Sequence, residues 1–346
     1  MQMMGQAMET IEAMEGFAVE TVEGLIFTVK GLVHPPRRVV AYLRFMPDPA
    51  GDRKRGSICY RRVYRFEEQR EILQLRFPIY IGHDPVFGLE VQGVPEQYAG
   101  KIYDPCFRLA KILENGARGP LEEKALAFAN LLKDASGVPA GSLGVSGSVL
   151  VGLHGPGSDV DLVVYGDGES RAVHGALGRL LDGCRGSVRR LDGAELAALH
   201  ASHRTDASLS FSDFARHQLR KVNEGHYAGI PYFVRFIKGM GEGREHYGDA
   251  VYQPLGNAAI RFRVADDGDA IFTPCRYAVE DVSLLNRAGE VDLREVVSFR
   301  GRFSDQVRAG ERAIARGRLE RVIPRAGDVH HRLTVGGEAG DYLLSE

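Results

Sequence analysis

The sequence predicts a multidomain α+β protein in which a central domain with a mixed sheet lies between a β-rich N-terminal domain and a β-barrel-like C-terminal module. A chain of 346 residues is too long for one ordinary hydrophobic core. Short apolar runs bounded by Pro, Gly and Asp fill both ends of the chain, whereas apolar residues recur at near-helical spacing between them. We expect four segments: a loose start (1–16), a β-rich domain (17–117), a central domain (118–255) and a β-rich, Arg-rich module (256–346).

The composition is that of a globular protein, with 44% hydrophobic and 26% charged residues. No stretch approaches the roughly 20 apolar residues that span a bilayer, and the Met-rich start lacks the pattern of a secretory signal. We therefore expect a cytoplasmic protein with no membrane partner. A net charge of -2 gives no overall attraction to nucleic acid, so such a partner would need a local basic surface. The composition leaves the oligomeric state open.

In the first domain the apolar runs over 24–30, 38–45 and 77–81 predict strands. Residues 105–134 predict a helical stretch that ends before Gly137, because leucines and other apolar residues recur there at near-helical spacing.

The central domain is predicted to alternate strands and helices. Strands are expected over 143–146 and 158–165, with a short helix between them, and over 229–237. Helices are expected over 171–181, 193–203 and 211–223. The C-terminal module is predicted to contain strands over 260–264, 270–273, 296–299 and 313–322.

Two acids open the second central strand. Side chains alternate across a strand, so Asp159 and Asp161 point to one face while Val160 and Leu162 pack on the other. Neighbouring carboxylates repel unless a cation or proton sits between them, and hard oxygen ligands suit Mg²⁺ together with substrate phosphate oxygens. The pair is therefore a candidate metal site.

A Gly-Ser pair lies at the turn between the first strand and the short helix. Gly147 would allow a phosphate to approach the backbone closely, and Ser148 supplies a hydroxyl beside backbone amides. A phosphate bound there would lie opposite the metal.

This segment, Gly-Ser followed by an apolar spacer and then Ser-Asp-x-Asp opening a strand, resembles the nucleotidyltransferase superfamily, whose members have a polymerase beta-like fold. The resemblance covers about residues 120–240. It implies that Gly147, Ser148 and Ser158 bind a nucleoside triphosphate (NTP) and that Asp159 and Asp161 are catalytic and hold Mg²⁺ or Mn²⁺. Three further runs (34–44, 271–277 and 300–303) make the whole chain similar to uncharacterised archaeal predicted nucleotidyltransferases.

One position departs from the superfamily pattern. The superfamily usually places a third carboxylate on the strand beside the Asp-x-Asp strand, but the candidate strand 231–237 carries Arg235 and no acid. Asp192 is an alternative that reads equally well as a helix N-cap. Later alternatives are Asp266, Asp267 and Asp269. The sequence leaves the third ligand open.

Arginines outnumber acids between residues 294 and 325. Arg300, Arg302, Arg316 and Arg318 lie at alternate positions of two strand-like runs and are candidate nucleic-acid contacts, because arginine matches phosphate geometry. Arginine is also the general basic residue of this chain, so an ordinary solvated surface is the alternative.

The function expected from these features is metal-dependent transfer of a nucleoside monophosphate from an NTP to an acceptor hydroxyl, with RNA as one candidate acceptor. A small molecule or a protein side chain is a second class of acceptor. The remaining alternative is a nucleotide- or RNA-binding protein whose site has lost its third ligand.

Overall fold

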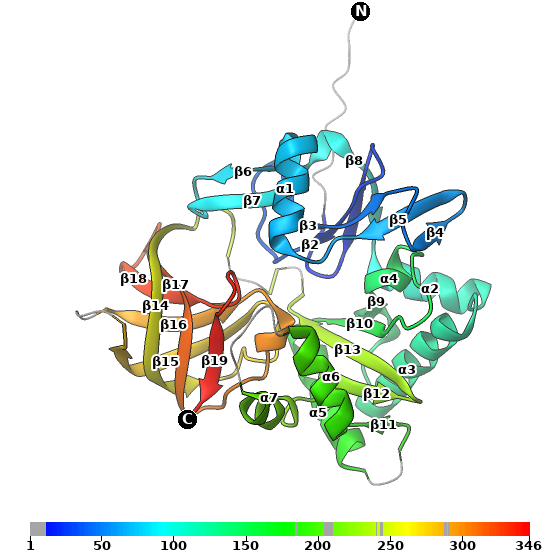
Figure 1. Ribbon diagram of the computed structural model, residues 1–346. Helices are drawn as coiled ribbons and strands as arrows, with labels where there is room; N and C mark the ends of the chain where they lie inside the picture. Colours follow the sequence, from blue (N-terminus) through cyan, green and yellow to red (C-terminus); the bar gives the residue numbers. More distant parts are fainter. Residues whose placement is uncertain are drawn as a thin grey trace, which may run out of the picture.

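The computed structural model describes residues 12–183, 186–203, 210–239, 241–242, 245–286, 289 and 291–346. Within these ranges the strands form three separate sheets, one from each successive part of the chain, with seven α-helices (Figure 1). The α+β class predicted from the sequence is confirmed. None of the helices in these ranges is both long enough and apolar enough to cross a membrane.

The first sheet has eight strands in the order β4-β5-β3-β2-β1-β8, with β7 paired to both β3 and β6. The strands are β1 (Ala18–Thr21), β2 (Ile26–Val29), β3 (Arg38–Pro47), β4 (Arg53–Arg55), β5 (Ile58–Arg62), β6 (Ile81–Asp84), β7 (Leu89–Pro95) and β8 (Ala99–Tyr103). Between β5 and β6 lie helix α1 (Phe66–Arg76) and a 3-10 turn (Pro78–Tyr80), and a second 3-10 turn (Glu96–Tyr98) precedes β8. Phe27 and Leu43 face each other across β2 and β3, and both are fully buried in the core.

Residues 12–16, which we placed in the loose start, pack against this sheet. Ala13 and Met14 are buried in its core, and Glu15 has no exposed surface. Residues 1–11 lie outside the described ranges.

The second sheet is mixed and has the order β11-β12-β13-β10-β9, in which only β10 and β13 run parallel. Its strands are β9 (Leu143–Val145), β10 (Val160–Tyr165), β11 (Val188–Arg189), β12 (Glu224–Tyr227) and β13 (Ile230–Ile237). The helices of this part are α2 (Pro105–Asn115), α3 (Pro120–Ser136), α4 (Gly147–Leu150), α5 (Asp167–Asp182), α6 (Gly193–His203) and α7 (Phe211–Gln218), with a 3-10 turn (Ala140–Ser142) before β9.

The helical stretch expected over 105–134 is two helices, not one. Gly116 and Gly119 both have positive φ, and Pro120 starts α3 because its missing N–H costs nothing in the first turn. Gly137 ends α3 in the left-handed conformation, with its N–H donating to the carbonyl of Lys133. Both helices join the core of the second sheet, so α2 packs with the central part of the chain.

The third sheet has the order β14-β15-β16-β18-β17-β19, and an additional pairing of β14 with β17 closes five of its strands into a ring. The strands are β14 (Ala250–Asp266), β15 (Cys275–Leu284), β16 (Leu293–Ser298), β17 (Arg312–Pro324), β18 (His330–Thr334) and β19 (Tyr342–Ser345). A 3-10 turn (Gly301–Phe303) follows β16. Buried Phe262, Tyr277 and Leu319 lie inside this ring.

The three parts contact one another around the centre of the molecule (Figure 1). The hydroxyl of Tyr165 on β10 donates to the backbone carbonyl of Glu15 at 3.0 Å. Between the second and third parts, Nε2 of His174 on α5 lies 3.1 Å from Oδ2 of Asp305. The second part of the chain is therefore fixed by side-chain contacts to both of the others.

Replacing Asp305 by Asn is expected to lower the free energy of unfolding by about 2–3 kcal/mol, since His174 and Arg308 lose the charge of the buried carboxylate with which they pair. Burial alone would raise the pKa of Asp305, but hydrogen bonds from His174 and Arg308 hold this pKa below its ordinary value. A lowered folded-state pKa means that the carboxylate stabilises the protein above its ordinary pKa and loses this effect as the pH falls through the acid range.

Denaturant unfolding of the wild type and Asp305→Asn at neutral and acid pH measures this difference. Asp328→Asn is the matched control because the Asp328 side chain is 88% exposed. Equal stabilities of the Asp305 variant and the wild type at neutral pH would contradict the prediction.

Candidate functional site

The turn after β9 brings the backbone of Gly147 against the side chain of Asp161. The N–H of Ser146 donates to the carbonyl of Asp161 at 2.8 Å, and β9 pairs with β10 through Val145 and Leu162. A Cβ built on Gly147 would overlap Oδ2 of Asp161 and lie 2.8 Å from its Cγ. Because φ of Gly147 is also +60°, both the backbone conformation and the available space require glycine there.

Asp159 and Asp161 lie at the start of β10, as the spacing predicts. Asp159 is exposed one residue before the strand, whereas Asp161 is half-buried between the fully buried Val160 and Leu162. Burial and then the charge of Asp159 raise the pKa of Asp161 to about 7, against the opposing charges of Arg235 and Arg44. Two carboxylates that repel in this way favour a bound cation between them.

Arg235 lies on the strand beside β10, where the superfamily resemblance leads us to expect a third acid. It pairs in register with Val163, and its Nη1 lies 3.4 Å from Oε1 of Glu15. Glu15 also accepts hydrogen bonds from Lys30 Nζ at 2.9 Å and from the N–H of Gly31 at 2.7 Å. The positive charge of Arg235 on β13 is thus balanced by the buried Glu15 from the first part of the chain.

Glu224 is an acid near the site that the sequence did not indicate. Asp161 and Glu224 both pair in register with Phe233, so the three residues form a row on one face of the sheet. Burial raises the pKa of Glu224 most, the charge of Lys221 and a hydrogen bond from Gln218 lower it, and Asp159 raises it further. Asp159 and Glu224 are therefore within electrostatic reach of each other. In the sequence, Glu224 is marked only by its position shortly before the predicted strand 229–237.

The other candidates for a third ligand have different partners. Asp192 Oδ1 accepts from the N–H of Glu195 at 2.9 Å, which is the N-cap alternative for this residue. Asp269 is paired with Lys238 at 2.7 Å. Among the residues that the structure describes, no group of three or more His, Cys, Asp or Glu side chains lies close enough together to hold a metal ion.

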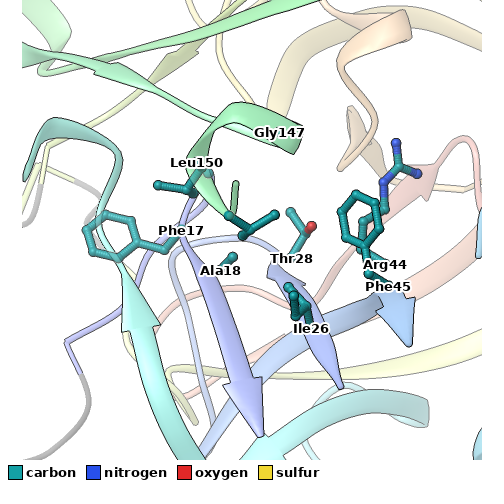
Figure 2. Close-up of a pocket in the computed structure, with 10 residues that line it drawn as sticks. Phe17, Ala18, Ile26, Thr28, Arg44, Phe45, Gly147 and Leu150 are labelled. Atoms are coloured by element: carbon teal, nitrogen blue, oxygen red, sulfur yellow. The ribbon is translucent and has the colours of Figure 1, made fainter. Parts of the chain in front are cut away.

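A small cavity of about 30 Å³ adjoins the turn at Gly147. It has room for water and not for a nucleotide. Arg44 and Thr28 line it from β3 and β2, and Gly147 and Leu150 line it from α4 (Figure 2). The first sheet therefore faces the Gly147 turn directly.

The part of the chain that contains the turn and the two acids is similar to a known domain family. Residues 128–240 match the model of the nucleotidyltransferase domain family. Over 327 residues the chain is 31% identical to "Uncharacterized protein MJ1086" of Methanocaldococcus jannaschii, an alignment that covers 92% of this chain and 94% of the archaeal protein. The chain belongs to this family of nucleotidyltransferase-domain proteins. No solved structure matches it significantly.

Within the nucleotidyltransferase domain, Ser148 and Ser158 have different surroundings. Ser148 is partly exposed next to exposed Gly147. Ser158 is buried, and its Oγ accepts from the N–H of Gly155 at 3.0 Å and from Arg53 Nη1 at 3.2 Å. These contacts hold the loop that leads into β10.

The four candidate nucleic-acid arginines lie outside this domain in two different settings, one pair in the turn after β16 and the other pair on β17. Arg300 and Arg302 are not on a strand as expected, because β16 ends at Ser298, whose Oγ accepts from the N–H of Arg300, and the chain turns there. Arg316 and Arg318 are on β17, but β18 separates β17 from β16 in the sheet. Arg318 is paired with buried Glu320 at 2.7 Å. The two runs are therefore not neighbouring strands.

Proposed function

We propose that the protein transfers a nucleoside monophosphate from an NTP to an acceptor hydroxyl, with Asp159 and Asp161 as the catalytic pair. The observation that carries this proposal is the contact of the Gly147 backbone with the Asp161 carboxylate. It puts a solvent-accessible turn, where a phosphate could bind, beside two carboxylates that repel each other. A nucleotidyl transfer site needs these two elements side by side.

The donor set suits Mg²⁺ or Mn²⁺, because both carboxylates supply hard oxygen atoms and substrate phosphate oxygens would complete the coordination. When bound, such an ion lowers the pKa of the acceptor hydroxyl and neutralises charge on the phosphates. Asp159 and Asp161 would hold it, and the Gly147 turn with the hydroxyls of Ser148 and Ser158 would position the triphosphate.

In the proposed reaction, the acceptor oxygen forms a bond to the α-phosphorus while the bond from that phosphorus to the bridging oxygen of pyrophosphate breaks. The hydroxyl proton leaves to water, and pyrophosphate departs with the bonding electrons. Little covalent chemistry falls to the protein, so positioning and charge neutralisation provide most of the rate enhancement.

Ser148→Ala is expected to weaken NTP binding by about fivefold, since one hydroxyl hydrogen bond is lost and the backbone N–H groups of the turn remain. Calorimetry with a non-hydrolysable NTP analogue and Mg²⁺ measures the change. Ser142→Ala is the control, because the Ser142 hydroxyl donates to the carbonyl of Pro139 before β9. Unchanged affinity in Ser148→Ala would count against its phosphate-binding role.

RNA is the acceptor that we propose first, with Arg300, Arg302, Arg316 and Arg318 as its phosphate contacts. Support comes from the loop between β18 and β19. A Cβ on Gly336 would lie 3.3 Å from Arg300 Cδ, and one on Gly340 would lie 2.6 Å from Arg316 Nη1, so this loop gathers arginines of both settings. The pairing of Arg318 with Glu320 reduces the net charge of the cluster and keeps small-molecule and protein acceptors open.

Incubation of the purified protein with each labelled NTP, Mg²⁺ or Mn²⁺, and total cellular RNA tests the proposal. Transfer of label to RNA supports the RNA acceptor, and transfer only when a small-molecule or protein fraction is added identifies the other class.

A second candidate is a nucleotide- or RNA-binding protein with a degenerate site. Arg235 favours it, because this residue stands on the strand where the superfamily usually carries its third acid. Nucleotide binding without any label transfer, with either metal and with every acceptor fraction, would support this candidate over the enzyme.

A further inference from the structure

Two arginines of the first sheet share one exposed aromatic ring. Cζ of Arg44 lies 4.1 Å from the ring centre of Tyr64, and Cζ of Arg62 lies 5.0 Å from the same centre. In the part of the chain that the structure describes, no carboxylate is within ion-pairing distance of either guanidinium. Stacking uses the flat face of a guanidinium and leaves the N–H donors at its edge available.

Two nearby arginines, unlike Arg44 and Arg62, are paired with acids. Arg61, which adjoins Arg62 in β5, is paired with Glu68 and also lies 3.3 Å from Asp48. Arg235, on the strand next to β10, is paired with Glu15. Arg44 and Arg62 are therefore a pair of like charges without the acid that balances their neighbours, and two such cations repel unless an anion lies between them.

Arg44 is placed at the candidate site. The N–H of Val63 donates to its carbonyl at 2.9 Å, which fixes the backbone, and its side chain lines the same cavity as Gly147. Burial lowers the pKa of Arg44, while Tyr64, Asp161 and Asp159 raise it, so the two acids are within electrostatic reach. Arg44 thus lies beside the turn that contacts Asp161, and in the described part of the chain no ion pair joins it to either carboxylate.

A ligand that bridges Arg44 and the carboxylates would present anionic oxygens to a guanidinium and, through a cation, to the carboxylates. We propose that Arg44 and Arg62 bind the β- and γ-phosphates of the NTP, which extends the proposed function by adding a polyphosphate subsite from the first sheet. Guanidinium forks match phosphate oxygens in pairs, and Arg44 would neutralise charge on the departing pyrophosphate.

A triphosphate is favoured over an RNA backbone phosphate because of where Arg44 lies. It borders the Gly147 turn, which the proposed function assigns to the triphosphate, and it does not belong to the four arginines proposed for RNA. If the RNA backbone were the ligand, loss of Arg44 would weaken RNA binding and leave polyphosphate binding unchanged.

Calorimetry with Mg²⁺ tests the proposal on the full chain, with α,β-methylene NTP analogues, inorganic tripolyphosphate and the free nucleosides as probes. We expect Arg44→Gln and Arg62→Gln each to weaken binding of the analogue and of tripolyphosphate by about tenfold or more, with nucleoside binding unchanged. Arg44→Lys keeps the charge but loses the two-pronged guanidinium, so its polyphosphate affinity should lie between those of Arg44→Gln and the wild type. Arg61→Gln is the control: it removes the same charge from a neighbouring residue, and its polyphosphate affinity should stay within about twofold of that of the wild type.

Thermal unfolding shows whether each variant is folded. If Arg44→Gln does not fold, the affinity of Arg44→Lys decides the test. Wild-type polyphosphate affinity in the arginine variants, together with weakened binding in Asp161→Asn, would overturn this subsite and leave the proposed function standing. A wild type that binds neither the analogues nor tripolyphosphate would overturn both. A loss confined to RNA binding would also overturn the subsite.

Discussion

Replacing Asp161 by Asn is expected to remove nucleotidyl transfer, with a loss on the order of 10³-fold or more. Asn keeps the size of the side chain and loses the charge that holds the cation. Its neutral amide also removes the repulsion with Asp159, so the fold should survive and the melting temperature should not fall. Initial rates of label transfer at saturating metal, with the acceptor fraction that the label-transfer experiment identifies, measure the effect.

Asp159→Asn is expected to have a similar effect on the rate, because both carboxylates are proposed to hold the same cation. Asp182→Asn is the matched control in the same domain, since the Asp182 side chain is 74% exposed and is paired with Arg190 at the end of α5. Wild-type turnover in either Asp159→Asn or Asp161→Asn would refute the site.

The positions of the turn and of the Asp pair could be predicted because they are encoded locally. Gly147, Asp159 and Asp161 lie within the short segment from β9 through α4 to β10, and alternation along the strand determines which side chains share a face. The fold class and the strand over 229–237 follow from apolar patterns of the same short range.

The rest of the site depends on contacts between distant parts of the chain. The pairing of Glu15 with Arg235 and the approach of Arg44 to the Gly147 turn arise only when the first sheet packs against the second. The row that joins Asp161 to Glu224 depends on the register of two further strand pairs. No spacing in the sequence indicates such contacts, because they are fixed by packing between elements.

Predictions from local sequence patterns were also wrong where an apolar pattern competes with a residue that ends the element. The apolar spacing over 105–134 continues across Gly116 and Gly119, but their positive φ angles break the helix before Pro120. The strand-like alternation over 296–302 continues past Ser298, where the side-chain hydroxyl accepts the N–H of Arg300 and turns the chain. In both places the residue that ends the element has more influence than the apolar pattern.

Gly147→Ala is expected to lower the transfer rate by about 10²-fold, because the added methyl group and the Asp161 carboxylate cannot occupy the same space. Either the carboxylate rotates away from Asp159 or the turn moves away from β10, and each displacement disturbs the geometry needed for transfer. The positive φ adds about 1 kcal/mol of strain to the variant.

Gly157→Ala separates these two effects. Gly157 has a φ of +74°, so alanine is strained there to a similar degree, but a Cβ at Gly157 would meet no atom within 4 Å. We expect Gly157→Ala to lose a similar amount of stability in denaturant unfolding and to keep a transfer rate within about twofold of the wild type. If both variants lose activity equally, backbone strain in the loop accounts for the loss. The contact between Gly147 and Asp161 would then not be the feature that positions the Asp161 carboxylate for the proposed reaction.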